Sequence, residues 1–282
     1  NAGIDMVMVS GQGQPYKKFI RLLKESVEEG SIPLARIDDA VTRILKVKLR
    51  NGLFENPIVK NDALQVIGSD SHRDIARQAV RESMVVLKNQ DIIPISKNSK
   101  SIVVAGRGAD NLGMQCGGWT INWQGGQGDI TVGTTILDGI KKSVSADTNV
   151  IYSIDGKDLA MAEDELAVVV IGEDPYTEFF GDKDNLDLLN DDIETINTLK
   201  NKGYKVMVLL ISGRPMNIAD HINSWDGFAA VWLPGTEGDG ISDILFGDFQ
   251  SSGKLSYPWP IKAEYGANAE DKDLLFNFGF GL

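Results

Sequence analysis

Cysteine and histidine are scarce in this chain of 282 residues, which contains one cysteine, Cys116, and two histidines, His72 and His221. A single thiol excludes an internal disulfide and leaves the cellular compartment open. Two histidines far apart in the sequence argue against a histidine metal site and against a Ser-His-Asp triad. Chemistry that depends on clustered histidines or cysteines therefore has little support.

Positive charge and long apolar runs are also in short supply. The chain has 28 Lys and Arg against 40 Asp and Glu, a net charge of -12, which argues against nucleic acid or an anionic membrane as a partner. No apolar run approaches the ~20 residues of a membrane span, and no signal peptide is recognisable. At 42% hydrophobic and 24% charged residues, the composition is typical of a globular protein and fits a neutral substrate.

Several nucleotide and hydrolase motifs are absent as well. The sequence has neither a Walker A motif nor the Gly-x-Ser-x-Gly of a nucleophile elbow. Residues 106–113 read Gly-Arg-Gly-Ala-Asp-Asn-Leu-Gly and follow an expected strand. Their spacing does not match Gly-x-Gly-x-x-Gly and no helix is expected to open there, so a dinucleotide site is poorly supported.

The pattern from residue 66 onward predicts an α/β fold, a doubly wound, mainly parallel α/β sandwich. Apolar runs alternate with helical segments, which is typical of a parallel sheet covered on both faces. Expected strands lie at 101–106, 149–153, 166–171, 205–211 and 228–233. Expected helices lie at 71–89, 134–144, 187–202 and 239–247. Ligands bind such sheets at the carboxyl ends of strands, so the loops that start there are the candidate site.

The first part of the chain predicts a different structure. Residues 4–9 read as a buried strand, and helical patterns follow at 16–29 and 35–49. One β/α unit cannot form a core alone, so we interpret residues 1–49 as the end of a (β/α)8-type barrel, residues 50–65 as a linker and residues 66–282 as the sandwich. The chain opens without Met at a strand-like segment, so we expect it to be the C-terminal part of a longer protein.

The strongest catalytic candidate is Glu178. Residues 172–178, Gly-Glu-Asp-Pro-Tyr-Thr-Glu, follow a buried strand and place this glutamate on a loop. Partial desolvation there would raise its pKa, and a carboxyl that keeps its proton can act as a general acid. The alternative is a solvated loop carboxylate.

Two tryptophans supply the second candidate. Trp119 and Trp123 lie within a glycine-rich stretch, residues 116–125, which favours a loop rather than a helix. Indole faces beside an acid suit a sugar, because the C–H faces of a sugar ring stack on aromatic rings. The alternative is two core aromatics beneath the loop.

Other residues carry weaker signals. Asp182, Asp184 and Asp187 suit hydroxyl recognition, and their segment lacks the glycine and glutamate of a calcium loop, so no metal site is expected. Asp5 favours a structural hydrogen-bonding role. Met8 lies nearer the carboxyl end of the expected strand, where barrel active sites form, although ordinary core packing is the alternative.

In their order along nearly the whole chain, these motifs resemble glycoside hydrolase family 3, close to its β-glucosidases and β-glucan exohydrolases. The segments that carry the resemblance are residues 2–8, 36–45, 52–57, 86–89, 116–125, 173–178, 212–215, 232–238 and 278–282.

The resemblance implies an enzyme with a barrel followed by a sandwich and an active site between them. It implies that Glu178 is the acid/base, that Trp123 clamps a sugar at subsite +1 with Trp119 beside it, and that Met8 lines subsite −1. The family's nucleophile is an aspartate in a Ser-Asp-Trp-like motif, which is absent here and is expected upstream of Asn1. The implied substrates are β-linked glucosides or gluco-oligosaccharides, the implied partner is the protein's own N-terminal barrel, and no cofactor is expected. The resemblance favours a periplasmic or secreted location.

Two other functions remain open from the sequence. One is a β-N-acetylhexosaminidase of the same family, against which the long sandwich and Glu178 argue. The other is a non-catalytic sugar-binding module that uses the tryptophans as a platform.

Overall fold

The computed structural model describes residues 2–11, 13–58, 61–162, 165–263 and 273–282. The chain divides into two compact units, Asn1–Ile67 (unit 1) and Gly68–Leu282 (unit 2). Residues 59 and 60 of the expected linker lie outside the described residues, and η1 (Asn61–Val66), a 3-10 helix, follows them.

The described residues of unit 1 include two α-helices, α1 (Pro15–Glu28) and α2 (Leu34–Arg50), and neither contains a buried residue. The strand predicted at residues 4–9 is wrong, because this segment is irregular. A strand needs a neighbour to accept and donate its backbone hydrogen bonds, and the described part of unit 1 contains no other strand.

Asp5 has the structural role predicted for it. Its carboxylate accepts a hydrogen bond of 2.8 Å from Arg36 Nη2 and lies 3.7 Å from Arg43 Nη1. These ion pairs fasten the irregular N-terminal segment to α2.

Unit 2 is built on a six-stranded sheet in the order β1-β6-β5-β4-β2-β3. The strands are β1 (Val85–Asn89), β2 (Ser101–Ala105), β3 (Asn149–Ser153), β4 (Leu166–Gly172), β5 (Lys205–Ile211) and β6 (Gly227–Trp232). All neighbours run parallel except β1, which pairs antiparallel with β6. The predicted mainly parallel sandwich is therefore confirmed.

Strand β1 corrects the prediction of one helix over residues 71–89. Helix α3 spans Asp70–Ser83, and Met84 has extended dihedral angles, φ -60° and ψ 129°. The two β-branched residues that follow, Val85 and Val86, favour a strand, and both are buried against β6.

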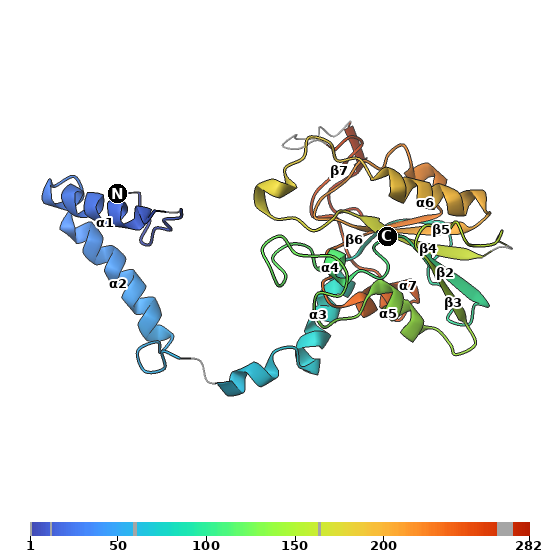
Figure 1. Cartoon of the computed structure of the whole chain (residues 1–282), viewed down its shortest axis with the longest axis horizontal. Coiled ribbons are helices and arrows are strands. Elements are labelled where there is room, and N and C mark those ends of the chain that lie inside the picture. Colours follow the sequence, from blue (N-terminus) through green and yellow to red (C-terminus); the bar gives the residue numbers. More distant parts are fainter. Residues whose placement is uncertain (1, 12, 59–60, 163–164, 264–272) are drawn as a thin grey trace. The chain divides into compact units, whose positions relative to one another are not determined.

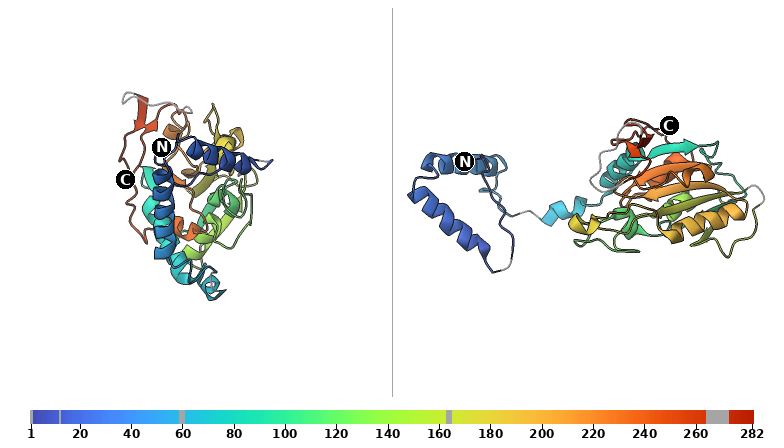
Figure 2. Two further views of the ribbon diagram at one scale, coloured as in Figure 1. Left: turned by 90° about the vertical axis from the view of Figure 1, so that its left-hand side faces the viewer. Right: turned by 90° about the horizontal axis from the view of Figure 1, so that it is seen from above.

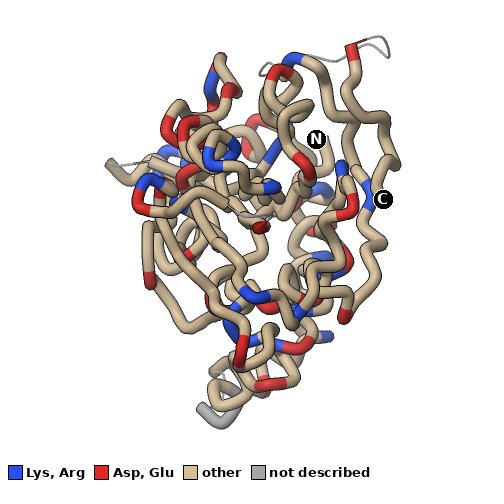
Figure 3. Tube along the Cα trace, turned by 90° about the vertical axis from the view of Figure 1, so that its right-hand side faces the viewer, with Lys and Arg blue, Asp and Glu red and all other residues tan. Residues whose placement is uncertain are grey.

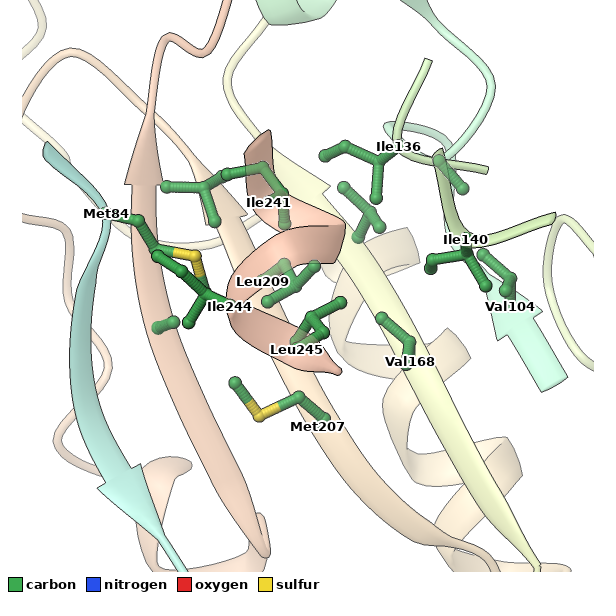
Figure 4. Close-up of a cluster of buried hydrophobic side chains, with 14 of the residues drawn as sticks. Met84, Val104, Ile136, Ile140, Val168, Met207, Leu209, Ile241, Ile244 and Leu245 are labelled. Atoms are coloured by element: carbon green, nitrogen blue, oxygen red, sulfur yellow. The ribbon is translucent and has the colours of Figure 1, made fainter. Parts of the chain in front are cut away.

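Helices cover both faces of the sheet, as Figures 1 and 2 show. Helix α6 (Asn190–Asn201) lies on one face, and α3, α5 (Ile136–Ser143) and α7 (Gly238–Leu245) lie on the other. Each face has its own hydrophobic core. Figure 4 shows the core beneath α5 and α7.

Strand β5 shows why the sheet needs both layers. Its side chains point alternately to opposite faces, so Met207 and Leu209 enter the core under α7, whereas Val208 and Leu210 enter the core under α6. All four are 0% exposed. A strand buried on both faces reads as one continuous apolar run, as β5 does.

The remaining elements are short. They are α4 (Leu112–Cys116), η2 (Glu178–Gly181), η3 (Ile222–Ser224), and the antiparallel pair β7 (Trp259–Pro260) and β8 (Leu274–Phe276). Acidic and basic residues are interspersed along the chain (Figure 3). No helix in the described residues combines the length and the apolar character that crossing a membrane requires.

Candidate functional site

Two loops at the carboxyl ends of strands in unit 2 bring the predicted residues together. The acid loop, residues 173–181, follows β4 directly. The tryptophan loop, residues 117–125, follows α4, which itself comes after β2. Strands β2 and β4 are neighbours in the sheet, so their carboxyl ends deliver both loops to the same edge.

The tryptophan loop exposes both indoles. Trp119 is 68% exposed and Trp123 is 42% exposed, so the alternative of two core aromatics is wrong. The loop closes on itself where the Trp119 amide donates to the Trp123 carbonyl oxygen at 3.0 Å. Trp119 and Ile121 both take left-handed backbone angles, with φ of 60° and 65°, which non-glycine residues adopt rarely.

Thr177 binds the two loops to each other. Its side chain is buried, and its Oγ1 donates to the Trp123 carbonyl oxygen at 3.0 Å. Gln124 Nε2 donates to Thr177 Oγ1 at 2.7 Å, and the Thr177 amide donates to Gln124 Oε1 at 3.2 Å. Because three hydrogen bonds join neighbours of Trp123 and Glu178, the platform and the acid are held as one assembly.

Two glycines permit this close approach. A Cβ atom on Gly118 would lie 2.2 Å from Thr177 Cγ2 and 2.3 Å from the Tyr176 carbonyl oxygen. Gly125 has φ +75°, and a Cβ there would lie 2.9 Å from Pro175 Cβ in the acid loop. The glycine-rich composition of the tryptophan loop is therefore a packing requirement against the acid loop.

Glu178 occupies a strained position at the start of η2. Its φ is 50°, and holding a non-glycine residue there costs on the order of 1–3 kcal/mol, a strain found often at functional sites. Its side chain is exposed, and among the described residues its carboxylate has no hydrogen-bond or ion-pair partner. The partial desolvation expected from the sequence is thus not provided by unit 2.

Arg214, which follows β5, holds the acid loop through contacts with three of its residues. Its Nη2 donates to Glu173 Oε1 at 2.6 Å, and its Nη1 donates to the Gly181 carbonyl oxygen at 2.6 Å. Its guanidinium carbon lies 4.7 Å from the centre of the Tyr176 ring. The Arg214 side chain therefore contacts the beginning, middle and end of the loop.

Tyr176 also holds Glu173 in place. Its hydroxyl donates to Glu173 Oε2 at 3.0 Å. Burial and the negative charge of Glu173 raise the pKa of Tyr176 to about 12, against the opposing effect of Arg214. The phenol therefore stays protonated and keeps donating at any physiological pH.

A second arginine holds the loop where it leaves the strand. Arg107 donates to the Asp174 carboxylate and to the Gly172 carbonyl oxygen, and its Nε donates to Asp192 Oδ1 at 3.2 Å. Burial raises the pKa of Asp192 despite the neighbouring arginine charge. Within residues 106–113, Arg107 thus serves in positioning the acid loop. A helix does open there, α4 at Leu112, contrary to expectation, but it has only five residues.

The three aspartates Asp182, Asp184 and Asp187 do not form one site. Asp187 accepts a hydrogen bond of 2.6 Å from Asn217 Nδ2, and this bond, with a second from Asn185, lowers the pKa of Asp187. Asp187 therefore takes part in a structural contact, although its side chain is exposed, as are those of Asp182 and Asp184. In the part of the chain that the structure describes, no three His, Cys, Asp or Glu side chains are grouped to hold a metal ion.

Two candidates remain: Cys116, the last residue of α4, and Met8. Burial raises the pKa of the Cys116 thiol, which disfavours the reactive thiolate. Met8 belongs to unit 1, where it is 94% exposed. Its expected place in subsite −1 stays a prediction.

Three residues of the site, Thr177, Gln124 and Arg214, have roles that were not expected from the sequence. A signal was present for Arg214, because it and Glu173 follow neighbouring parallel strands and carry opposite charges. Nothing in the sequence pairs Thr177 with Gln124, because their contact depends on how two irregular loops fold against each other.

A doubly wound sheet whose strand ends carry a loop-borne carboxylate and exposed indoles defines an α/β domain with a candidate binding site at the carboxyl ends of its strands. Residues 84–282 match the glycosyl hydrolase family 3 C-terminal domain. The chain therefore belongs to glycoside hydrolase family 3.

Similar proteins agree with this assignment. A lysosomal β-glucosidase from Dictyostelium discoideum is 33% identical over 100% of this chain and 38% of its own length. A β-xylosidase from Formosa agariphila is 28% identical over 100% of this chain and 44% of its own length. Among solved structures, a Q683A mutant of an exo-1,3/1,4-β-glucanase from a Pseudoalteromonas species superposes with a TM-score of 0.84 and 35% identity, covering 99% of this chain and 47% of that one. The chain thus spans less than half the length of these relatives.

Proposed function

We propose that this chain belongs to a retaining, exo-acting β-glucosidase or β-glucan glucohydrolase that releases glucose from non-reducing ends. In this proposal Glu178 protonates the glycosidic oxygen and later activates water. Trp123 and Trp119 hold the sugar on the leaving-group side. The nucleophilic aspartate comes from a barrel domain that precedes Asn1 in the complete protein.

One observation carries the proposal. Glu178, a carboxylate without a protein partner among the described residues, is held at a left-handed backbone position one residue from Thr177, which is hydrogen-bonded to the carbonyl of Trp123. Protonation of a bound sugar's leaving oxygen needs an unpaired acid held near the surface that binds the sugar, and the Thr177 hydrogen bond to the Trp123 backbone supplies such a link. A solvated surface glutamate would need none of this support.

The exposure of Glu178 also fits the proposal. Retaining enzymes place the nucleophile and the acid/base about 5–5.5 Å apart, so the acid must face a second carboxylate rather than its own domain. We therefore expect residues 1–282 alone to have no glycosidase activity.

The test is Glu178→Gln in the complete enzyme, measured on substrates of different leaving-group acidity. General acid catalysis contributes ~10²–10⁴-fold, and an activated aryl glucoside needs little of it. We expect kcat/KM to fall by about that factor for laminaribiose or cellobiose, and far less for dinitrophenyl β-glucoside. Azide should restore turnover of the aryl glucoside in this variant and yield β-glucosyl azide, because it needs no general base.

The matched control is Glu194→Gln, the same change on the exposed face of α6. It should leave every rate within about twofold, as expected of a surface substitution. Equal losses on poor and good leaving groups in Glu178→Gln, or no azide product, would contradict the acid/base role.

A substrate panel separates this proposal from its rivals. The complete protein should hydrolyse aryl β-glucoside faster than the matched β-xyloside or N-acetyl-β-glucosaminide. A preference for N-acetyl-β-glucosaminide would favour the β-N-acetylhexosaminidase, and sugar binding without any hydrolysis would favour the non-catalytic module. β-1,3-, β-1,4- and β-1,6-linked disaccharides would then define the linkage.

A further inference from the structure

Three aromatic rings form one exposed apolar surface beside Glu178, which we call the aromatic ledge: Trp123, Phe179 and Phe180. The ring centre of Trp123 lies 6.0 Å from that of Phe179 and 5.6 Å from that of Phe180, both edge-to-face. The two phenyl rings lie 4.6 Å apart and are tilted by 31°. The ledge is thus a packed cluster in which each ring fixes the other two.

The ledge remains accessible in unit 2. Phe179 is 61% exposed and Phe180 is 54% exposed. Apolar side chains of this size normally gain from burial, and the described residues of unit 2 leave more than half of each uncovered. Scattered single apolar residues on a surface need no explanation, but a contiguous aromatic group marks a binding surface.

The position of the ledge determines what binds there. Phe179 directly follows Glu178, and Phe180 follows Phe179, so both extend from the acid on the side held against Trp123. The sugar-clamping role proposed for Trp123 places the departing group on this side. A leaving group that extends beyond the first bonds from the glycosidic oxygen therefore meets the two phenyl rings.

The chemistry of the ledge favours apolar leaving groups. A phenyl ring carries no hydrogen-bond donor or acceptor, in contrast to the indole N–H or the tyrosine hydroxyl. A sugar can place its C–H face on a ring, but any hydroxyl that it turns toward Phe179 or Phe180 loses water without compensation. Alkyl or aryl carbon would instead be removed from water together with the phenyl rings.

Resting on the proposed function, we infer that Phe179 and Phe180 are specificity-determining residues that select β-glucosides whose leaving group carries an extended apolar alkyl or aryl surface. They act on binding of the leaving group and take no part in proton transfer.

The experiment is a series of n-alkyl β-glucosides, from ethyl to hexyl, hydrolysed by the complete enzyme. The leaving alcohols differ little in acidity, so the contribution of Glu178 cancels and only apolar surface changes along the series. A fully buried methylene contributes about fourfold in affinity, and a half-covered ledge should give about tenfold in kcat/KM across the four added methylenes. In the double variant Phe179→Ser/Phe180→Ser the series should flatten to within about twofold.

Two further variants keep the inference falsifiable. Phe179→Leu/Phe180→Leu retains apolar surface and should retain most of the slope. Met161→Ser, a change at a 67% exposed residue that precedes β4 at the opposite edge of the sheet, should leave the slope unchanged. A melting temperature equal to that of the wild type in every variant establishes that folding is unaffected.

A flat series in the wild-type enzyme would overturn the inference, as would an undiminished slope in the double serine variant. A complete enzyme that hydrolyses no β-glucoside at all, activated aryl glucosides included, would instead overturn the proposed function, and this inference with it.

Discussion

The interior of the sheet and the loops at its carboxyl edge use opposite means of holding a side chain in place. In β5, residues 206–211 are all 0% exposed and pack against helices on both faces. At the edge, Trp119, Trp123 and Glu178 are exposed, and two of them have left-handed backbone angles. Burial positions the first group, whereas hydrogen bonds and close glycine contacts position the second.

This difference predicts that substitutions in the interior change stability, whereas substitutions in the loops change activity. Removing an interior side chain leaves a cavity and costs free energy of unfolding. Removing an exposed loop side chain costs little stability, because water already surrounds it. If the loops carry the function, changes there should affect kinetics and leave the melting temperature nearly unchanged.

The largest stability effect is expected in the interior. Leu209→Ala, in the core shown in Figure 4, should lower the free energy of unfolding by about 3 kcal/mol, because Leu-to-Ala changes at buried sites cost about 2–5 kcal/mol. Chemical denaturation of residues 68–282 measures this change. The selectivity between aryl glucosides and disaccharides in the complete enzyme should not change. A loss of selectivity without a loss of stability would break the comparison.

The second prediction concerns the ion pairs that join α3 to α7. Asp243 is buried and accepts hydrogen bonds from Arg77 Nε at 2.7 Å and Arg81 Nε at 2.5 Å. Burial alone would raise the pKa of Asp243, but the two arginines outweigh it and the pKa is lowered. Asp243→Asn should cost about 2 kcal/mol of stability at pH 7, since hydrogen bonds to charged groups contribute about 1.5–3 kcal/mol.

The direction of the pKa shift of Asp243 also predicts how the stability difference between wild type and Asp243→Asn changes with pH. A carboxyl whose pKa is lower in the folded state contributes stability above its unfolded pKa of about 3.9, and loses it as pH falls through the folded pKa. The stability difference between wild type and Asp243→Asn should therefore be constant from pH 7 to about pH 5 and shrink below about pH 4. A difference that stays constant down to about pH 2.5 would mean that ionisation of Asp243 contributes nothing.

The same contrast explains what the sequence could predict. The central strands were predictable because burial on both faces leaves an uninterrupted apolar run, as in β4 and β5. Strand β1 was not, because a helical pattern runs directly into Val85, and the pairing that makes the segment a strand comes from β6, far away in the sequence. The strand expected at residues 4–9 failed for the converse reason, since its apolar pattern has no neighbouring strand in the described part of unit 1.

The residues proposed for the site follow from residue type and from the resemblance, whereas their geometry does not follow from the sequence. Glu178, Trp119 and Trp123 were identified from residue type, and the structure places their loops together. No sequence rule assigns a left-handed backbone to a glutamate, and the Thr177–Gln124 contact joins two loops that lack a periodic pattern. The loop that folds least regularly carries the proposed chemistry, so the sequence is least informative about its conformation.

The smallest expected change in free energy is for Trp123, in the loops at the carboxyl ends of the strands. This variant distinguishes the loops from the interior most clearly, because it should change kinetics without changing stability. Trp123→Ala in the complete enzyme should lower kcat/KM for laminaribiose or cellobiose by about tenfold, equal to ~1.4 kcal/mol, a typical contribution of an aromatic contact. Hydrolysis of methyl β-glucoside should change less, because its leaving group barely reaches the ring. The melting temperature should stay within about 2 °C, since Trp123 is already 42% exposed. A large fall in melting temperature with unchanged disaccharide kinetics would instead make Trp123 a support for Phe179 and Phe180 rather than a surface for sugar.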